Sequence, residues 1–305
     1  MCDTCAEHTH SHEHGHEHSH HAVLPHNARG DDFRVVVTGK GGVGKTTLTA
    51  LLARQLARRS YEVLALDADP QMNLPYALGM RTEDARRLVP LSENLDYVEE
   101  KTGARPGQGW GLFFRLNPDV DDVVGRFGVR APDGVRLLVM GNTVQPAAGC
   151  LCPENALLAA VTNSLSLRRN EAVLMDTQAG FEHFGRALAK GFRHAVVVTD
   201  PTFNGLQAAL HAARLASELG IPAVHLVVNR ARDARDFERT LERLDEEGAF
   251  RFTSMHWLPV DDVLPDMEPS VGALLARSPT LFDDKLGALL DALLNEQEEL
   301  LQCAS

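Results

Sequence analysis

Residues 33–59 of the 305-residue chain read FRVVVTGKGGVGKTTLTALLARQLARR, and this stretch decides the fold. The run FRVVVT is typical of a buried strand, GKGGVGKTT of a glycine-rich turn, and the remaining residues have the apolar spacing of an amphipathic helix. Residues 39–46 fit the pattern GxxxxGK[ST] between a strand and a helix, which is the context that a phosphate-binding loop requires. The sequence therefore predicts a P-loop nucleotide-binding protein.

The chemistry of this loop follows from its residue types. Glycines allow backbone N–H groups to converge on phosphate oxygens, and the start of the helix adds a favourable dipole. We expect the Lys45 ammonium to attract the outer phosphates and the Thr46 hydroxyl to hold Mg²⁺. The expected nucleotide contacts come from the whole loop: Gly39, Lys40, Gly41, Gly42, Val43, Gly44, Lys45, Thr46 and Thr47.

Strand and helix patterns alternate along the rest of the chain. Such alternation predicts an α/β fold with a doubly wound, mostly parallel sheet, whose ligands bind at the carboxyl ends of the strands. Residues 75–132 break the rhythm, so we interpret them as an insertion within a P-loop domain that spans residues 33–305. Further strands are predicted at 62–67, 135–140, 172–176, 195–199 and 223–229, and helices at 154–167, 204–218, 234–246 and 281–302.

Bulk composition excludes several functions. The apolar content of 44% and the charged content of 24% are those of a globular protein. The net charge of −12 disfavours nucleic acid as a partner. No run approaches 18 consecutive apolar residues, and the N-terminus lacks the basic and apolar pattern of a signal peptide, so we expect a cytoplasmic protein without membrane contact. The acidic face of the last predicted helix favours packing against the body or a partner over a membrane surface.

The loop contains a second lysine, Lys40, directly after its first glycine. The string GKGGVGKTT resembles the deviant Walker A loop of the class that includes MinD, ArsA and the nitrogenase iron protein. This resemblance implies that Lys40 reaches across a dimer to the nucleotide of the partner subunit. It therefore implies an ATPase that forms an ATP-dependent homodimer.

Two further segments are similar to those of this class. Asp67 and Asp69 close the strand EVLALD, and Asp69 lies 24 residues after Lys45, the spacing at which the class keeps the carboxylate that orients the attacking water. Asp176 begins DTQAG, which is similar to the Walker B and switch II segment. The resemblance implies that Asp176 holds Mg²⁺ through water and that Gly180 lets the loop move around the γ-phosphate. The alternative for Asp176 is a simple cap at the end of a strand.

The identity of the base can also be judged from the sequence. GTPases carry NKxD after a late strand, whereas this strand ends with Asn229, Arg230, Ala231 and Arg232, which favours adenine. The segment HWLPVDD resembles the one that passes over adenine in the class. It adds Pro259 and Asp261 to Asn229 and Arg230 as expected contacts of the base.

Five cysteines form two close pairs, Cys2 with Cys5 and Cys150 with Cys152, while Cys303 stands alone. In a reducing compartment, close pairs indicate metal ligation or redox chemistry more than a disulfide framework. Cys150 and Cys152 can reach one metal, but a closed site needs four donors, which a twofold dimer supplies. The alternative is two loop cysteines that happen to be close.

Taken together, these motifs resemble the CooC family of ATPases that mature carbon monoxide dehydrogenase by assisting nickel insertion. The motifs are the deviant Walker loop, DADPQMN, the CxC followed by Pro-Glu, and DTQAGFEHFGR. The resemblance runs from residue 33 to the last helix, and implies a nickel or zinc site shared by Cys150 and Cys152 of both subunits, with the dehydrogenase apoenzyme as partner. The family commonly has an acidic residue where Gln178 stands, which leaves the coupling through the switch segment open.

Residues 1–32 lack hydrophobic periodicity and predict a flexible tail. Neutral imidazoles bind Ni²⁺, Cu²⁺ or Zn²⁺, so we expect weak metal buffering rather than a purification tag, whose histidines usually form an unbroken run. The tail also resembles that of HypB, a nickel GTPase of hydrogenase maturation, which is one rival function. The other rivals are a MinD-like positioning ATPase and an iron–sulfur carrier. The tail histidines are His8, His10, His12, His14, His16, His18, His20, His21 and His26.

Overall fold

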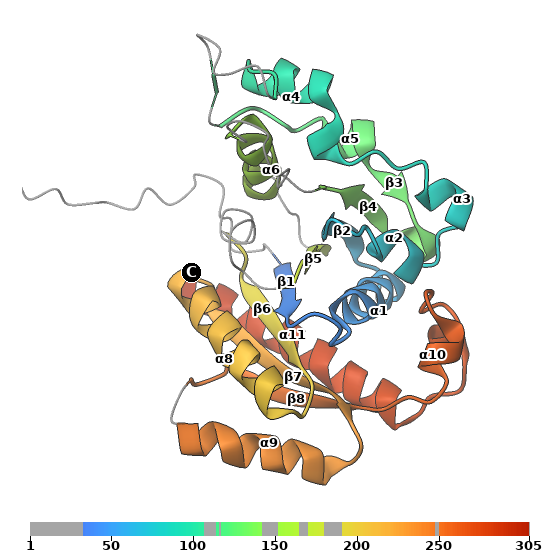
Figure 1. The fold of residues 1–305 in the computed structure, drawn as a ribbon, viewed down its shortest axis with the longest axis vertical. Coiled ribbons are helices and arrows are strands. Elements are labelled where there is room, and N and C mark those ends of the chain that lie inside the picture. Colours follow the sequence, from blue (N-terminus) through green and yellow to red (C-terminus); the bar gives the residue numbers. More distant parts are fainter. Residues whose placement is uncertain are drawn as a thin grey trace, which may run out of the picture.

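The fold is known from a computed structural model (Figure 1). It describes residues 33–106, 114–115, 117–141, 152–164, 170–179, 191–247 and 250–304. The histidine tail, Cys150 and Gly180 lie outside these residues, as does the side chain of Cys152.

Within the described residues, the centre of the molecule is an eight-stranded sheet with the order β3-β4-β2-β5-β1-β6-β7-β8. All pairings are parallel except that of β3 with β4. The predicted doubly wound sheet is confirmed. The strands are β1 (Phe33–Gly39), β2 (Glu62–Ala68), β3 (Val129–Arg130), β4 (Arg136–Val139), β5 (Glu171–Thr177), β6 (His194–Thr199), β7 (Ala223–Ala231) and β8 (Ser254–Pro259).

Helices cover both faces of the sheet because strand side chains alternate between them. In β1, Val35 and Val37 join the apolar cluster under α1 and α11, whereas Val36 joins the cluster under α6 and α8 (Figure 1). The helices are α1 (Lys45–Arg58), α2 (Leu74–Ala77), α3 (Thr82–Ala85), α4 (Leu95–Thr102), α5 (Val123–Phe127), α6 (Cys152–Ser164), α8 (Phe203–Glu218), α9 (Ala234–Glu247), α10 (Leu264–Met267) and α11 (Leu281–Ala304), with 3-10 turns η1 (Leu91–Glu93), η2 (Pro132–Gly134) and η3 (Leu274–Ala276).

The sequence analysis did not predict two of the strands, β8 and β3. β8 is an edge strand of mixed exposure, so its residues SMHWLP do not form the apolar run that marks the central strands. β3 consists of two residues at the opposite edge. The last helix packs on the body as expected, since Leu286, Leu289 and Leu290 are fully buried. Along the described part of the chain, no helix is long and apolar enough to span a membrane.

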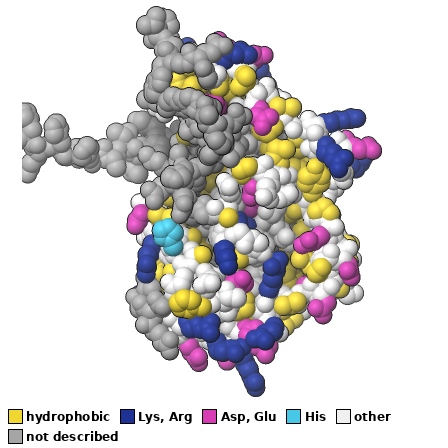
Figure 2. Space-filling view, viewed as in Figure 1, with side chains coloured by type: hydrophobic (Ala, Val, Ile, Leu, Met, Phe, Trp, Pro, Cys, Tyr) yellow, Lys and Arg dark blue, Asp and Glu magenta, His cyan; other side chains and the backbone are white. Residues whose placement is uncertain are grey.

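The surface carries both signs of charge. Figure 2 shows acidic, basic and apolar side chains mixed over one face, and basic side chains gather at its lower edge, where Figure 1 places α9. In α9 the buried carboxylate of Asp236 accepts hydrogen bonds from Arg232 and Arg239. These arginines are therefore partly neutralised by a carboxylate of the same segment.

Candidate active site

The P-loop joins β1 to α1 and is shaped by two glycines with positive φ. A Cβ atom on Gly39, which has a φ of 143°, would lie 2.1 Å from the carbonyl oxygen of Val198. A Cβ atom on Gly44, with a φ of 95°, would lie 2.6 Å from the side-chain nitrogen of Asn229. That nitrogen donates a hydrogen bond to the carbonyl of Val43 at 2.8 Å. Asn229, at the end of β7, therefore packs against the loop. The space at Gly39 and Gly44 is too small for a residue with a side chain.

Lys45 begins α1 at the centre of the site. Its ammonium donates to the carbonyl of Lys40 at 3.1 Å, so the side chain turns back along its own loop. Burial lowers the pKa of Lys45, while the nearby carboxylates of Asp176 and Asp69 act in the opposite direction. The loop therefore presents a desolvated positive charge, which interacts more strongly with an anion than an exposed lysine does.

Asp176 lies in β5, beside the start of α1. One of its oxygens accepts a 2.6 Å hydrogen bond from the hydroxyl of Thr46, and the other lies 3.4 Å from the hydroxyl of Thr49. Burial raises the pKa of Asp176 to about 6, against the lowering effect of these hydroxyls and of Lys45. A hydroxyl and a carboxylate are hard oxygen donors of the kind that Mg²⁺ binds. The Thr46 and Asp176 pair therefore fits the expected magnesium site.

Asp67 and Asp69 have different surroundings although they are two residues apart. Asp67 is fully buried and accepts hydrogen bonds from the backbone N–H groups of Asp69 and Leu74, both at 3.1 Å. Burial, together with the charge of Asp176 on the adjacent strand, raises the pKa of Asp67 to about 8. Asp69 is half-buried and accepts from the N–H of Gln71 at 2.9 Å. Asp67 therefore shapes the loop, while Asp69 is available to a ligand.

A pocket in front of the loop brings together most of the predicted phosphate contacts, and we refer to it as the P-loop pocket. Asp69 and Gln178 approach it from the carboxyl ends of β2 and β5, and Arg230 and Glu268 lie at its other side. Lys40 is exposed and is absent from the lining. The lining residues are Gly41, Gly42, Gly44, Lys45, Thr46, Thr47, Asp69, Pro70, Gln71, Asn73, Tyr76, Ala77, Gln178, Ala179, Arg230, Glu268 and Pro269.

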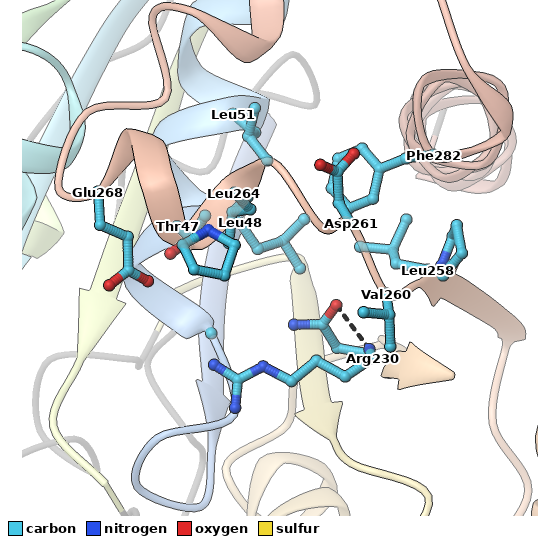
Figure 3. Close-up of a pocket in the computed structure, with 14 residues that line it drawn as sticks. Thr47, Leu48, Leu51, Arg230, Leu258, Val260, Asp261, Leu264, Glu268 and Phe282 are labelled. Carbon is cyan, nitrogen blue, oxygen red and sulfur yellow. Dashed lines mark hydrogen bonds between the residues drawn. The ribbon is translucent and has the colours of Figure 1, made fainter. Parts of the chain in front are cut away.

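A second, mostly apolar pocket lies between α1, β8 and α11, and we refer to it as the base pocket (Figure 3). Figure 3 shows Phe282 and Asp261 on one side of it, with Arg230 and Glu268 towards the P-loop pocket. Arg230 and Glu268 line both pockets, so the two are continuous. The lining residues are Gly44, Thr47, Leu48, Leu51, Asn229, Arg230, Leu258, Pro259, Val260, Asp261, Leu264, Pro265, Glu268 and Phe282.

The predicted base contacts all lie in this pocket, but two of them are engaged elsewhere. The amide of Asn229 donates to Val43 and accepts from the N–H of Arg230 at 2.9 Å. The carboxylate of Asp261 pairs with both outer nitrogens of Arg277, at 2.5 and 2.9 Å. Their side chains therefore build the walls of the pocket. Sequence reasoning missed Leu264, Glu268 and Phe282. Leu264 and Phe282 are apolar residues at the start of a helix, and Glu268 is one of many acidic residues in a loop, so none carries a local signal.

The metal site expected at the cysteines falls largely outside the described residues. Cys152 is the first residue of α6, and Cys150 and the histidine tail are not described. Among the residues that are described, no three histidine, cysteine, aspartate or glutamate side chains cluster as a metal site. His194 and His225 are fully buried and hydrogen-bonded to each other at 3.2 Å.

Comparisons with known proteins agree with this geometry. Residues 34–268 match the CobQ/CobB/MinD/ParA nucleotide binding domain. The chain is 36% identical over 261 residues to the carbon monoxide dehydrogenase accessory protein CooC of Rhodospirillum rubrum, which covers 86% of this chain and 96% of that protein. It is 37% identical over 214 residues to an uncharacterised ATP-binding protein of Methanocaldococcus jannaschii, covering 70% of this chain and 80% of that protein.

Among solved structures, the cell division ATPase MinD of Pyrococcus furiosus matches with a TM-score of 0.61 and 21% identity, over 87% of this chain and 99% of that one. MinD of Pyrococcus horikoshii, solved with Mg-ADP, matches with a TM-score of 0.59 and 19% identity, over 86% and 94% of the two chains. At this level of identity the structural likeness shows the fold.

Proposed function

The chain belongs to the family of the carbon monoxide dehydrogenase accessory protein CooC, within the CobQ/CobB/MinD/ParA class of nucleotide-binding ATPases, and on that premise we propose that it is a cytoplasmic metallochaperone whose ATP hydrolysis assists nickel insertion into carbon monoxide dehydrogenase. The observation that carries this proposal is the 36% identity to the accessory protein over 96% of its length. The proposed partner is the dehydrogenase apoenzyme.

The arrangement of the P-loop pocket supports specific roles in hydrolysis. The Lys45 ammonium stabilises negative charge on the outer phosphates, and Thr46 and Asp176 would hold Mg²⁺, which supplies further positive charge when bound. Asp69 lines the same pocket as Lys45 and orients the attacking water by accepting its hydrogen bond. The water oxygen bonds to the γ-phosphorus, the bond from that phosphorus to the β–γ bridging oxygen breaks, and ADP leaves together with phosphate, which takes up the proton of the water.

Lys40 supports a nucleotide-dependent homodimer. Its side chain is exposed and does not line the P-loop pocket of its own chain, although its backbone carbonyl accepts from Lys45. We assign Lys40 to the nucleotide of the partner subunit. A charge delivered in this way makes hydrolysis depend on dimerisation, because only the dimer completes the set of groups around the phosphates.

The metal site is assigned to Cys150 and Cys152 of both subunits. Four thiolates satisfy the tetrahedral preference of Zn²⁺, and they can also hold Ni²⁺ in a planar arrangement. The histidines of the tail hold additional Ni²⁺ weakly and raise its local concentration. ATP-driven association of the two subunits thus assembles the metal site, and ATP hydrolysis releases the metal.

The decisive experiment measures metal content and oligomeric state with and without ATP. We expect the full chain to bind one tight Ni²⁺ or Zn²⁺ per dimer and to dimerise with ATP, as measured by light scattering. The Cys150→Ala/Cys152→Ala variant loses the tight metal and fails to activate nickel-starved dehydrogenase, whereas the matched Cys303→Ala variant keeps both properties. Retention of the tight metal by the double variant, with residues 1–30 removed to exclude the tail, would refute the shared site.

A further inference from the structure

One wall of the P-loop pocket is built from two segments that lie far apart in the sequence. The end of α2 contributes Tyr76 and Ala77, and the segment after α10 contributes Glu268 and Pro269. The N–H of Val271 donates to the carbonyl of Ala77 at 3.0 Å, so the two segments lie side by side. Glu268 also lines the base pocket, so a nucleotide that occupies both pockets passes along this wall. We refer to its two segments, residues 76–79 and 268–272, as the composite wall.

Arg54, in the second half of α1, contacts the composite wall from outside the pocket. Its side chain is only 8% exposed, and it is not among the described residues that line either pocket. Its Nη1 donates to the carbonyl of Leu78 at 3.3 Å. A Cβ atom on Gly272 would lie 3.0 Å from the same nitrogen, and one on Gly79 would lie 3.5 Å from it. The guanidinium therefore fits between the two segments, where two glycines leave room for it.

Asp133 fixes the orientation of this guanidinium. Its carboxylate accepts from the Nε of Arg54 at 2.7 Å and from the Nε of Arg58, one turn further along α1, at 3.2 Å. Arg58 also donates to the carbonyl of Leu275, just beyond the composite wall, at 2.7 Å. One carboxylate thus orients two arginines of α1 towards the segment that carries Glu268.

The same helix carries the phosphate-binding groups. Lys45 and Thr46 begin α1, and Arg54 follows about two and a half turns later. Val271 and Leu274 are buried in the apolar cluster that α1 shares, but apolar contacts have no preferred direction. The bonds of a guanidinium have a fixed planar geometry. Arg54 therefore determines where the composite wall lies relative to the P-loop.

We propose that Arg54, oriented by Asp133, is a positioning residue that holds the composite wall in the place that a bound nucleotide requires. This inference rests on the nucleotide site of the proposed function and is independent of the metal site. Without the guanidinium the wall occupies other positions as well, and the apparent affinity for nucleotide falls with the fraction of molecules in which the wall is in place. A purely structural role predicts instead that Arg54 contributes to stability alone.

The test measures the affinity of the full chain for ADP with Mg²⁺ by titration calorimetry. Arg54→Met removes the guanidinium and keeps an unbranched apolar side chain. The matched control is Arg34→Met, because Arg34 is also buried and donates to the carbonyl of Thr162, but lies at the amino end of β1, away from the pockets. Gly272→Ala is a milder second variant, since the backbone there is outside the left-handed region and the added methyl group presses on Nη1 of Arg54.

We expect Arg54→Met to weaken ADP binding by about tenfold and Gly272→Ala to weaken it by about threefold, because the wall is in place for a smaller fraction of the time. Arg34→Met should bind ADP within about twofold of the parent, since distant sites act independently, while thermal melting should show that both arginine variants are destabilised. The kcat of Arg54→Met at saturating ATP should stay within about twofold of the parent, because the groups at the start of α1 keep their own hydrogen bonds.

A double-variant cycle tests the part played by Asp133. Asp133→Asn suits the left-handed backbone at this position, where φ is 57°, and removes only the charge. The double variant Arg54→Met/Asp133→Asn should bind ADP no more weakly than Arg54→Met alone, because the two residues act as one unit. Additive losses would overturn the orienting role of Asp133.

Two results would overturn the positioning role of Arg54 itself. One is an ADP affinity equal to that of the parent in Gly272→Ala and Arg54→Met, or in Gly272→Ala alone if Arg54→Met does not fold. The other is an equal loss of affinity in Arg54→Met and Arg34→Met. A parent chain that does not bind ADP would overturn the nucleotide site and this inference together.

Discussion

The two halves of the nucleotide site are built in different ways. The P-loop pocket is polar, and most of its predicted phosphate contacts come from one short segment of the chain, in which Lys45 bonds back to the carbonyl of Lys40. Asp176 joins this segment by accepting from Thr46, although the two residues lie 130 positions apart. The base pocket is mostly apolar, and its walls come from segments far apart in the chain, namely α1, the end of β7, residues 258–268 and α11. The phosphate loop is therefore encoded locally, whereas its contact with Asp176 and the whole base pocket exist only after the sheet has formed.

This difference indicates how each half contributes to activity. Charged and buried groups around the phosphates act on the reacting atoms, where preorganised electrostatics have their largest effect. Apolar walls around a base contribute mainly to binding, which acts equally on the ground state and the transition state. Substitutions in the P-loop pocket should therefore lower kcat, and those in the base pocket should raise KM.

The largest effect is expected for Lys45→Ala. This change removes a desolvated charge from the P-loop pocket, and we expect turnover at saturating ATP to fall by about 100-fold or more, the loss typical of one electrostatic catalytic group. Phosphate release measures it. Lys101→Ala is the matched control, because Lys101 pairs with Asp122 away from both pockets and should leave turnover unchanged. If Lys45→Ala kept more than a tenth of the activity, the role of the lysine would be wrong.

A smaller effect is expected from pH, through Asp176. Its pKa is raised to about 6 by burial, and only the ionised carboxylate binds Mg²⁺. The affinity gained from Mg²⁺ is thus present above pH 6 and lost as the pH falls, by up to about tenfold for each unit below the pKa. Titration of ADP with and without Mg²⁺ at pH 7.5, 6 and 5 measures this loss.

The matched variant for this titration is Asp176→Asn, which keeps the shape of the side chain. It should abolish the Mg²⁺ dependence at every pH, while the protonation of the nucleotide itself stays the same in both proteins. A variant with the same pH profile as the natural chain would show that another group binds the metal. Asp67, with its pKa raised to about 8, is protonated at neutral pH and should not substitute for Asp176.

The same difference explains what could be predicted from the sequence. The P-loop, Asp69 and Asp176 could be predicted because their spacing relative to strands and helices follows from the fold class, which brings the carboxyl ends of β1, β2 and β5 to one edge of the sheet. Asn229 was identified by its position after a strand, but its hydrogen bond to Val43 needs the side-by-side arrangement of β1, β6 and β7. A motif therefore predicts the site in which a residue lies better than it predicts the residue's hydrogen-bond partner.

The base pocket shows where such prediction ends. Phe282 starts the contact of α11 with the body, and in the sequence it is one of many apolar residues with helical spacing. Its place in the pocket depends on β8, the edge strand whose mixed exposure hides it from pattern analysis. Arg277 likewise lies 16 residues from Asp261, and no local rule pairs them.

The smallest effect is expected for Asp261→Asn, which tests the base pocket. The change removes the charge that Arg277 contacts at 2.5 and 2.9 Å, so the wall formed by residues 258–264 is held less firmly. Because this wall acts on binding, we expect KM for ATP to rise about fivefold, equivalent to ~1 kcal/mol, with kcat unchanged. Asp283→Asn is the matched control, since Asp283 contacts the same arginine at 3.4 Å but lies outside the pocket lining. If both changes raised KM equally, Arg277 would stabilise the fold in general. A fall in kcat in Asp261→Asn would contradict the claim that the base pocket acts on binding alone.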